Sequence, residues 1–432
     1  MPSFDFAIGL TANGLDAVSV SLYQQVPQLF KGTQQASVSG IEYTVDWNVE
    51  APATFDLSDP AGAQSALRAH MDAAEPPLGV AASSTPPPSA ALLDLAAANA
   101  AAFSFTYQSV GLALSAPGVS PAVLTIALTA TAHIAVSGTQ QTMVIDGMTT
   151  PQQSDPVQNW IVQNVVLPEM LASSQQIFGG VTIPEITLPG LTLGPPVPFV
   201  QDNTLIAVAN LATEPQPDVP AAGTVDWPGS DFFTLISQNA FQALTANYIA
   251  TSQSTMSDSG SSGNHWGGDD WSYSLGIGSP RVTLNADASV TLDAAVQGSV
   301  AASIYVLYVP IGVGFTAYTE PGLSAQLSVT VEGSSLVVKT TSVASFVLVV
   351  APSGSVPEEI VGGMLEPIVL AVVAAFSPFV SSFLGGIQFA SFDIPTYTVS
   401  VGGVTITMAP TNLTVSSVDG MLALVGGTAI SG

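Results

Sequence analysis

A long helical run with few charges, ended by two glycines and followed by alternating strands, occurs twice in this chain and limits its fold more than any other feature. In the second half the run spans 357–384, ends at Gly385–Gly386, and leads into FASFDIPTYTVSVGGVTITMAP. In the first half the run spans 156–178, ends at Gly179–Gly180, and leads into VTIPEITLPGLTLGP and TLIAVANLA. Such a repeated order of elements indicates one structural unit present twice.

The boundaries of both runs carry helix signals. Asp155 and Pro156 supply an N-cap and a first-turn proline for the first run, and Ser355 and Glu358 form a capping box for the second. We expect Gly179 to take the left-handed conformation that commonly ends a helix. The second run would be about 42 Å long and is apolar on nearly every face, so we expect it to be buried all round.

A shorter amphipathic helix is predicted to open each unit, over 15–30 and over 231–250. A tryptophan in an alternating strand segment follows each of them. Trp47 and Trp271 are 224 residues apart, whereas the glycine pairs that end the long runs are 206 apart. In the segment 59–102 the strand pattern is lost, and two short helical pieces flank a linker rich in Pro, Ser and Ala. This segment accounts for the difference as an insertion in the first unit.

These observations predict an α+β protein of two tandem modules. The first module spans 1–213 and includes the insertion, a Pro-rich linker spans 214–229, and the second module spans 230–432. Long segments rich in Val, Thr and Ile between the helices read as antiparallel strands, with small residues on the alternate face. The segment 258–270 is predicted to be a Gly/Ser loop.

The charge composition excludes several classes of partner. Charged residues make up only 8% of the chain, and the net charge is −27 because there are just four cations, Lys31, Arg68, Arg281 and Lys339. A protein this poor in cations cannot present a phosphate-binding patch, so nucleic-acid binding is excluded. The same deficit argues against electrostatic docking on anionic lipids, so any lipid contact must be apolar.

The sequence leaves the compartment open. There is no cysteine, which excludes disulfides and thiolate metal sites. The segment MPSFDFAIGLTANG has no basic region and no sustained apolar core, so no classical signal peptide is expected. This acidic composition fits both a cytoplasmic protein and a bacterial protein exported by a non-classical route.

Enzyme and metal motifs are missing from the sequence. It contains no G-x-S-x-G, no H-E-x-x-H and no Walker-type loop, so we expect no catalytic residues, no enzymatic activity and no cofactor. Asp258, His265, Asp269 and Asp270 could together ligate a divalent ion. Exposed acids in a Gly/Ser loop are the commoner explanation, so no metal site is predicted.

The order of elements, the Gly-Gly after a long apolar helix, and strands such as TIPEITLPGLTL and FDIPTYTVSVGGVTI together resemble the TULIP superfamily of tubular lipid-binding proteins, which includes the bactericidal/permeability-increasing (BPI) protein. The resemblance covers roughly 4–215 and 228–432. It implies an elongated, pseudo-symmetric rod of two modules, each a long, highly twisted antiparallel sheet wrapped around two long helices. It also implies an apolar groove beneath the helices that holds acyl chains.

Two features of secreted animal members, a disulfide and a basic tip, are absent here, so endotoxin binding is not implied. A closer likeness is to tandem TULIP proteins encoded in bacterial toxin gene clusters. The long run 360–384 has the length of a membrane span but contains two prolines and lacks flanking cations, so integral membrane insertion is not expected.

The expected function is therefore binding, transfer or carriage of a lipid, a fatty acid or another extended apolar ligand. Candidates for the groove lining, chosen by helical spacing, are Leu22, Val26, Phe30, Phe241, Leu244, Leu365, Ile368, Val372 and Phe376. One alternative is a non-enzymatic assembly protein with filled grooves and a protein partner in a toxin or secreted complex. Another is a β-rich extracellular adhesin or metal-stabilised structural protein.

Overall fold

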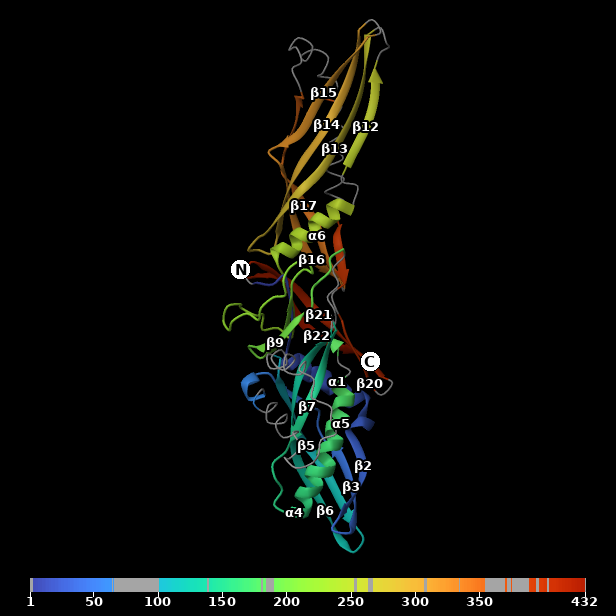
Figure 1. Cartoon of the computed structure of the whole chain (residues 1–432), viewed down its shortest axis with the longest axis vertical. Helices are drawn as coiled ribbons and strands as arrows, with labels where there is room; N and C mark the ends of the chain where they lie inside the picture. The colour runs from blue at the N-terminus through green and yellow to red at the C-terminus, as the bar shows by residue number, and fades with distance from the viewer. Residues whose placement is uncertain are drawn as a thin grey trace, which may run out of the picture.

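The protein is an elongated rod in which β-strands run along most of the length (Figure 1). The computed structural model describes residues 3–63, 65, 101–137, 140–179, 182–183, 190–251, 255–262, 267–306, 309–333, 335–353, 370, 374, 388–393, 396–401 and 404–431. The predicted helix 357–384, apart from Leu370 and Ala374, and most of the predicted insertion 59–102 lie outside these described residues.

A seven-stranded antiparallel sheet occupies the middle of the rod, between a first-half sheet and a second-half sheet (Figure 1). Its order is β20-β21-β22-β11-β1-β10-β9. The bounds are β1 (Phe6–Thr11), β9 (Val197–Gln201), β10 (Thr204–Ala209), β11 (Phe232–Ile236), β20 (Tyr397–Val401), β21 (Val404–Val418) and β22 (Met421–Ser431). Strands from the start, middle and end of the chain therefore share this central sheet.

The order of the central sheet is symmetric about the β1–β11 pair. Strand β1 is followed by helix α1 (Ala12–Gln25) and pairs with β10, while β11 is followed by α6 (Gln238–Thr251) and pairs with β22. The turns that lead into β10 and β22 match as well, because Asp202–Asn203 and Asp419–Gly420 all have positive φ, as type I′ hairpin turns require. Corresponding residues of the two turns are 217 positions apart.

Two acidic residues join the halves reciprocally at this centre. The Asp5 carbonyl accepts the Ser237 N–H (2.8 Å), and the Asp5 carboxylate accepts the Ser237 hydroxyl (2.8 Å). The Asp231 carbonyl accepts the Thr11 N–H (3.1 Å), and its carboxylate accepts the Thr11 hydroxyl (3.4 Å). Thr11 caps α1 and Ser237 precedes α6. Each acid thus holds the residue that begins the other half's helix, and both equivalences have an offset of 226.

The first-half sheet has the order β2-β3-β5-β6-β7-β8, with β4 paired to β5. Its strands are β2 (Lys31–Val38), β3 (Ile41–Val49), β4 (Thr54–Asp56), β5 (Phe103–Ala116), β6 (Val119–Ser137), β7 (Gln140–Thr149) and β8 (Thr182–Ile183). A continuous helical run packs on β7 and consists of α4 (Pro156–Ile161), a π-helical turn (Val162–Val166) and α5 (Leu167–Phe178). The helix predicted over 156–178 is confirmed.

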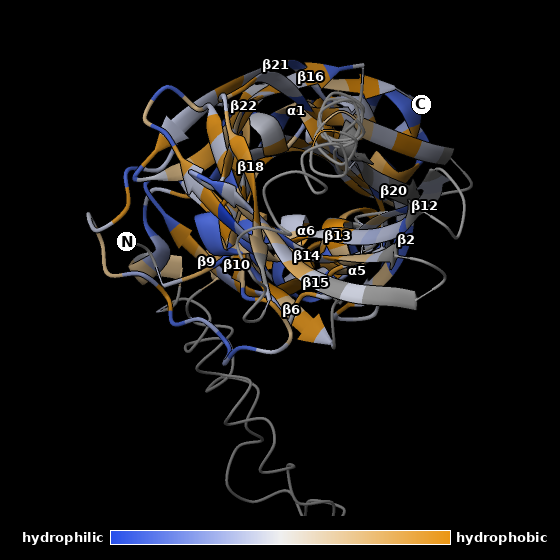
Figure 2. Ribbon diagram, turned by 90° about the horizontal axis from the view of Figure 1, so that it is seen from above, coloured by the Kyte–Doolittle hydropathy of each residue, from blue (hydrophilic) through white to orange (hydrophobic). Residues whose placement is uncertain are grey.

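The second-half sheet has the order β12-β13-β14-β16-β17-β19, with β15 paired to β14 and β18 paired to β15. Its strands are β12 (Thr255–Ser262), β13 (Gly267–Leu284), β14 (Val290–Val306), β15 (Val309–Glu320), β16 (Leu323–Glu332), β17 (Ser335–Val343), β18 (Val347–Pro352) and β19 (Gln388–Asp393). Helix α6 packs on β13. Seen along the rod, the strands form a curled wall with α1 and α6 inside it (Figure 2).

Three local predictions are wrong. The helix expected over 15–30 ends at Gln25, because Pro27 lacks the N–H needed to continue it and starts a short 3₁₀ turn (Pro27–Phe30). The helix expected over 231–250 begins only at Gln238, since Phe232–Ile236 is buried on both faces as a strand. Gly179 has φ −67, so it is not a left-handed cap.

The predicted loop 258–270 is also wrong, because its described residues belong to β12 and β13, which pair as a hairpin. In that hairpin Trp271 packs over its cross-strand partner Gly260. Trp47 packs in the same way over its partner Gly32 in the first half. The two tryptophans therefore occupy matching positions in the two halves.

The segment predicted as a linker is mostly exposed but is anchored to the central sheet by two buried residues. Val225 and Trp227 are buried on the outer face of the central sheet, and the Trp227 ring stacks on Phe4 (5.7 Å) and Phe233 (5.9 Å). The division of the chain at 214–229 stays a prediction, and strands on both sides of this segment lie in one sheet. No described helix combines the length and apolarity that a membrane crossing requires.

Candidate functional site

An apolar cavity lies where the central sheet, α1 and the first-half sheet meet. Its volume is about 700 Å³ when its open side is counted, and every lining residue that the structure describes is apolar. The lining residues are Ile8, Leu10, Leu15, Val18, Phe55, Ile134, Met143, Phe178, Leu205, Ile206, Ala207, Ile406 and Met408. The cavity is thus a site for hydrocarbon, since none of these side chains carries an ionisable group.

Strand and helix periods explain how local sequence builds the walls. In β1, alternation places Ile8 and Leu10 on one face, which is buried against α1. In α1, Leu15 and Val18 are nearly one turn apart and face the same core. Phe55 from β4 completes this part of the lining. Strand β1 and helix α1 are neighbours in space because they are consecutive in the chain, and β4 contacts α1.

The position of Phe55 is fixed by a hydrogen bond that it donates to a residue of α1. The Phe55 N–H donates to the Asp16 carboxylate at 2.7 Å, which ties β4 to the helix. Burial raises the pKa of Asp16, and the hydrogen bond from Phe55 opposes that rise. Asp16 therefore positions a wall residue while it remains outside the cavity lining.

The cavity is narrow as the side chains stand. The space left free between its walls would hold only about two water molecules. Two of the lining residues, Met143 and Met408, are flexible thioethers that adapt to gaps by changing rotamer. An alkyl chain would therefore enter by displacing these side chains rather than by filling an open tunnel.

The structure places the five predicted lining residues that it describes in the cores but not in this cavity lining. Leu22, Val26 and Phe30 are at most 2% exposed and belong to the same core as the cavity. Leu22 is a turn beyond Val18 on α1, and the other two lie past the end of the helix.

In the second half, Phe241 and Leu244 are buried in that half's own core. They follow Leu15 and Val18 by 226 residues, the offset that also relates Thr11 to Ser237. Four further candidates, Leu365, Ile368, Val372 and Phe376, lie outside the described residues. All nine stay predictions as ligand contacts.

Sequence reasoning named none of the thirteen described lining residues as ligand contacts. Ile206 and Ala207 come from β10, and Ile406 and Met408 come from β21 near the end of the chain. Local periodicity marks these segments as strands but does not show which helix they face. The matching turns before β10 and β22, 217 residues apart, are the signal that could have indicated their common sheet.

A buried polar pair lies in the same core. The Tyr107 and Ser174 hydroxyls are 3.0 Å apart, and Tyr107 is fully buried between β5 and α5. Burial raises the pKa of Tyr107 far above its usual range, and the hydrogen bond with Ser174 only partly opposes this. Tyr107 therefore stays neutral and acts as a packing residue with a satisfied hydroxyl.

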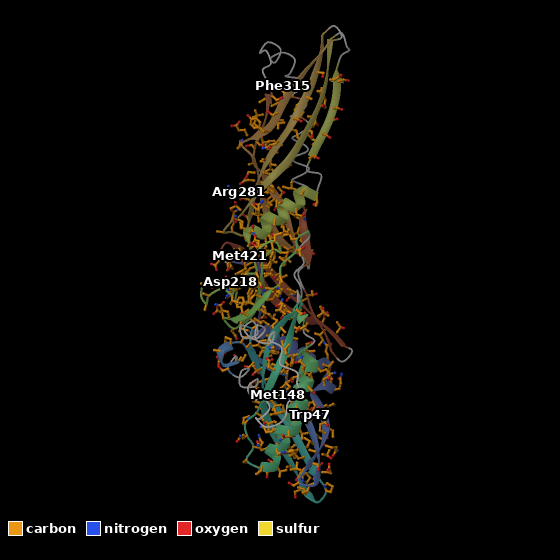
Figure 3. The ribbon with its side chains drawn as sticks, viewed as in Figure 1. Trp47, Met148, Asp218, Arg281, Phe315 and Met421 are labelled. Carbon is orange, nitrogen blue, oxygen red and sulfur yellow. The ribbon has the colours of Figure 1, made fainter. Side chains whose placement is uncertain are left out.

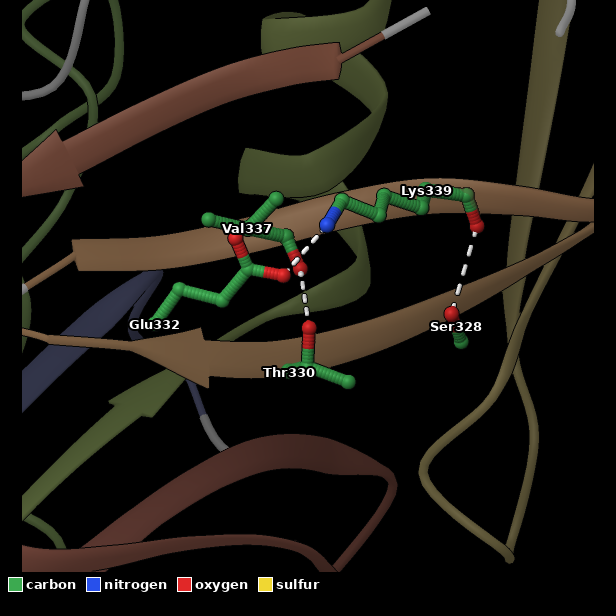
Figure 4. A network of polar contacts seen from close by, with 5 residues as sticks. All are labelled: Ser328, Thr330, Glu332, Val337 and Lys339. Carbon is green, nitrogen blue, oxygen red and sulfur yellow. Dashed lines mark hydrogen bonds and ion pairs between the residues drawn. The ribbon is translucent and has the colours of Figure 1, made fainter.

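No charged side chain is among the described residues that line the cavity. Lys339 pairs with Glu332 across β16 and β17 (Figure 4). His133 lies 2.8 Å from Asp146 on the adjacent strands β6 and β7. Within the part of the chain that the structure describes, no group of three or more His, Asp or Glu is placed to hold a metal ion.

Comparisons with known proteins find similarity at the level of structure alone. No protein-family model matches the chain, and no curated protein matches its sequence. Lipopolysaccharide binding protein is 9% identical, with 99% of each chain covered and a TM-score of 0.36. P47 from Clostridium botulinum A2 is 9% identical, with 98% of this chain and 97% of that chain covered and a TM-score of 0.44.

P47 of Clostridium botulinum E1 is 6% identical, with 99% of each chain covered and a TM-score of 0.41. The similarity to these three structures thus extends over nearly the whole of each chain, at identities below 10%. At such identities and TM-scores a shared family is not established.

Proposed function

We propose that this protein binds an extended apolar molecule, such as the chain of a lipid or fatty acid, in the cavity between α1 and the central sheet. The observation that carries the proposal is a lining of thirteen apolar residues without an ionisable group. Each CH₂ group moved from water into such a lining contributes about 0.8 kcal/mol. An eight-carbon segment would thus contribute about 6 kcal/mol before ordering and association costs.

The proposed role is binding rather than catalysis. The described lining residues include no nucleophile, acid or base, and the ligand would be held by shape and apolar contact. The chain has only four cations. We therefore expect that recognition of the ligand does not depend on a negatively charged head group. The proposal therefore covers carriage or transfer of the ligand without chemical change.

We further propose that the chain consists of two tandem TULIP-like modules with highly twisted sheets. Support comes from the reciprocal Asp5–Ser237 and Asp231–Thr11 contacts, which share an offset of 226 residues. The matching tryptophan–glycine pairs in β2–β3 and β12–β13 add independent support.

A matched pair of alanines on β10 tests the binding proposal. Ala207 lines the cavity, whereas Ala209 is buried on the same face of the same strand and does not line it. We expect Ala207→Leu to weaken binding of cis-parinaric acid, a fluorescent fatty acid, by about tenfold or more, because its added methyl groups occupy the ligand's space. Ala209→Leu should leave binding near the wild-type value. Equal binding by both variants would contradict this site.

A second candidate function rests on the narrowness of the cavity. Room for only about two water molecules suits an assembly protein whose groove is filled by its own side chains. Such a protein would act through a protein partner, for example in a toxin-associated or secreted complex. It would bind no cis-parinaric acid, and neither leucine variant would change that result.

A further inference from the structure

The end of the chain forms a three-stranded extension of the central sheet, which we name the C-terminal flap. It consists of β20 (Tyr397–Val401), Val404–Thr411 of β21, and Gly427–Ser431 of β22. Strand β22 pairs with β11 through Leu422–Gly426, and the register stops there. Among the described strands, the three parts of the flap pair only with one another. The flap therefore extends beyond the paired centre of the sheet.

The boundary of the flap has the features of a hinge. The β21–β22 register shifts between Thr411 and Thr414, which marks a β-bulge. Within the bulge, Asn412 has φ 52, a left-handed conformation. Gly426 and Gly427 lie opposite the bulge, and a Cβ at Gly426 would come within 2.5 Å of the Thr411 carbonyl oxygen. Bulge and glycine pair thus coincide at the residues where pairing to β11 ends.

The inner face of the flap forms part of the cavity wall. Ile406 and Met408 are 2% and 3% exposed, and they line the cavity from the same face of β21. Ile430, the cross-strand partner of Met408, packs against the same core. All other described lining residues come from elements before residue 210. The flap therefore covers the first-half cavity through apolar side-chain contacts, which can separate without breaking a strand ladder in the body.

We propose that the C-terminal flap is the gate of this cavity: it swings at the bulge and the glycine pair, and the ligand enters when Ile406 and Met408 withdraw. This inference rests on the proposed ligand binding and adds the route of entry and the residues that control it. It also accounts for a cavity that is narrow when closed. Met408, a flexible wall residue on the moving part, then sets how wide a chain the closed state accepts.

The hinge can be stiffened with little strain at one position. A Cβ at Gly427 would meet only the Thr411 hydroxyl, at an ordinary distance of 3.6 Å. We expect Gly427→Val to slow both association and dissociation of cis-parinaric acid by about fivefold in stopped-flow fluorescence, with the Kd nearly unchanged. Gly427→Ala, the milder variant, should show the same change at smaller size. Unchanged rates in both variants, with normal binding, would overturn the gate.

Hydrogen exchange gives a second, independent readout on the wild-type chain. We expect the amides of 404–411 and 427–431 to exchange faster than those of 422–425, and cis-parinaric acid to slow exchange in the flap alone. Protection confined to other elements would overturn the gate while leaving ligand binding intact. No binding of the probe by the wild type would overturn both the gate and the proposed function.

A methionine pair separates the role of Met408 from that of any buried methionine. Met408 lines the cavity from the flap, and Met421 is equally buried on β22, near the middle of the rod (Figure 3). Met421 belongs to the outer core of the central sheet. We expect Met408→Ala to raise the affinity for a branched fatty acid relative to cis-parinaric acid by about fivefold, and Met421→Ala to leave that ratio unchanged. Equal ratios in the two variants would overturn the assignment of Met408.

Discussion

Replacement of Asp5 by alanine should destabilise the protein far more than the same change at its counterpart, Asp231. Asp5 is 3% exposed, and its carboxylate accepts three hydrogen bonds. The donors are the Ser237 hydroxyl (2.8 Å), the Asn239 amide (3.0 Å) and the Leu211 N–H (3.1 Å). The Asp231 carboxylate accepts the Thr11 hydroxyl at the longer distance of 3.4 Å.

The size of the destabilisation depends on whether each donor keeps another hydrogen-bond partner after the substitution. A hydrogen bond to a charged group contributes about 1.5–3 kcal/mol, and a buried donor left unpaired costs about 1–3 kcal/mol. The Leu211 N–H is buried, whereas Asn239 also reaches Glu214 at 2.8 Å and keeps that partner. We therefore expect the free energy of unfolding to fall by about 3–5 kcal/mol in Asp5→Ala and by about 1 kcal/mol or less in Asp231→Ala.

Urea denaturation monitored by circular dichroism measures both changes, and Asp5→Asn, which keeps an acceptor, should fall between them. Hydrogen exchange should show faster opening at the start of α6, where the Ala240 N–H donates to Ser237. If Asp5→Ala were no more destabilising than Asp231→Ala, the role assigned to Asp5 in joining the two halves would be refuted.

Three smaller predictions follow from single contacts. Tyr107→Phe leaves the buried Ser174 hydroxyl without its 3.0 Å partner and should lower the free energy of unfolding by about 1–3 kcal/mol. The double variant Tyr107→Phe with Ser174→Ala should recover most of that loss in a double-mutant cycle measured by urea denaturation. Because the pKa of Asp16 is raised above 3.8 in the folded chain, the folded state binds the proton more readily, so its contribution to stability falls as pH rises through that region. The stability of Asp16→Asn relative to that of the wild type should therefore be higher at pH 7 than at pH 3. An equal difference in stability at both pH values would contradict this. Gly32→Ala would bring a Cβ within 2.8 Å of the Trp47 ring and should cost about 1–3 kcal/mol with an altered tryptophan emission spectrum; an unchanged spectrum and midpoint would count against that packing.

Local signals in the sequence predicted helices and strands where the determinants are near in the chain. Asp155 caps the helix that begins at Pro156, and its carboxylate accepts the N–H groups of Val157 and Gln158 as expected. The strand Phe232–Ile236 was missed because its apolar run also fits a helix, and only its pairing with β1, more than two hundred residues away, decides between them.

The apolar character of the candidate cavity could be predicted from the sequence, whereas the residues that line it could not, and the ligand class stays a prediction. The apolar face of the first helix was identified, yet the cavity uses Leu15 and Val18 rather than Leu22 and the residues after it. Ile406 reaches the cavity only because β21 joins a sheet with β1, and helical spacing carries no information on such pairing. Long-range strand order therefore limited the prediction more than hydrophobicity did.

Organic extraction of the purified wild-type protein and of Ala207→Leu, followed by mass spectrometry, tests the central claim most directly. The account predicts a fatty acid or lipid near one molecule per wild-type chain and a much smaller amount from Ala207→Leu, whose added side chain occupies the cavity. Equally clean extracts from both, unchanged after incubation of the proteins with phosphatidylcholine vesicles, would contradict ligand binding and favour the filled-groove assembly protein.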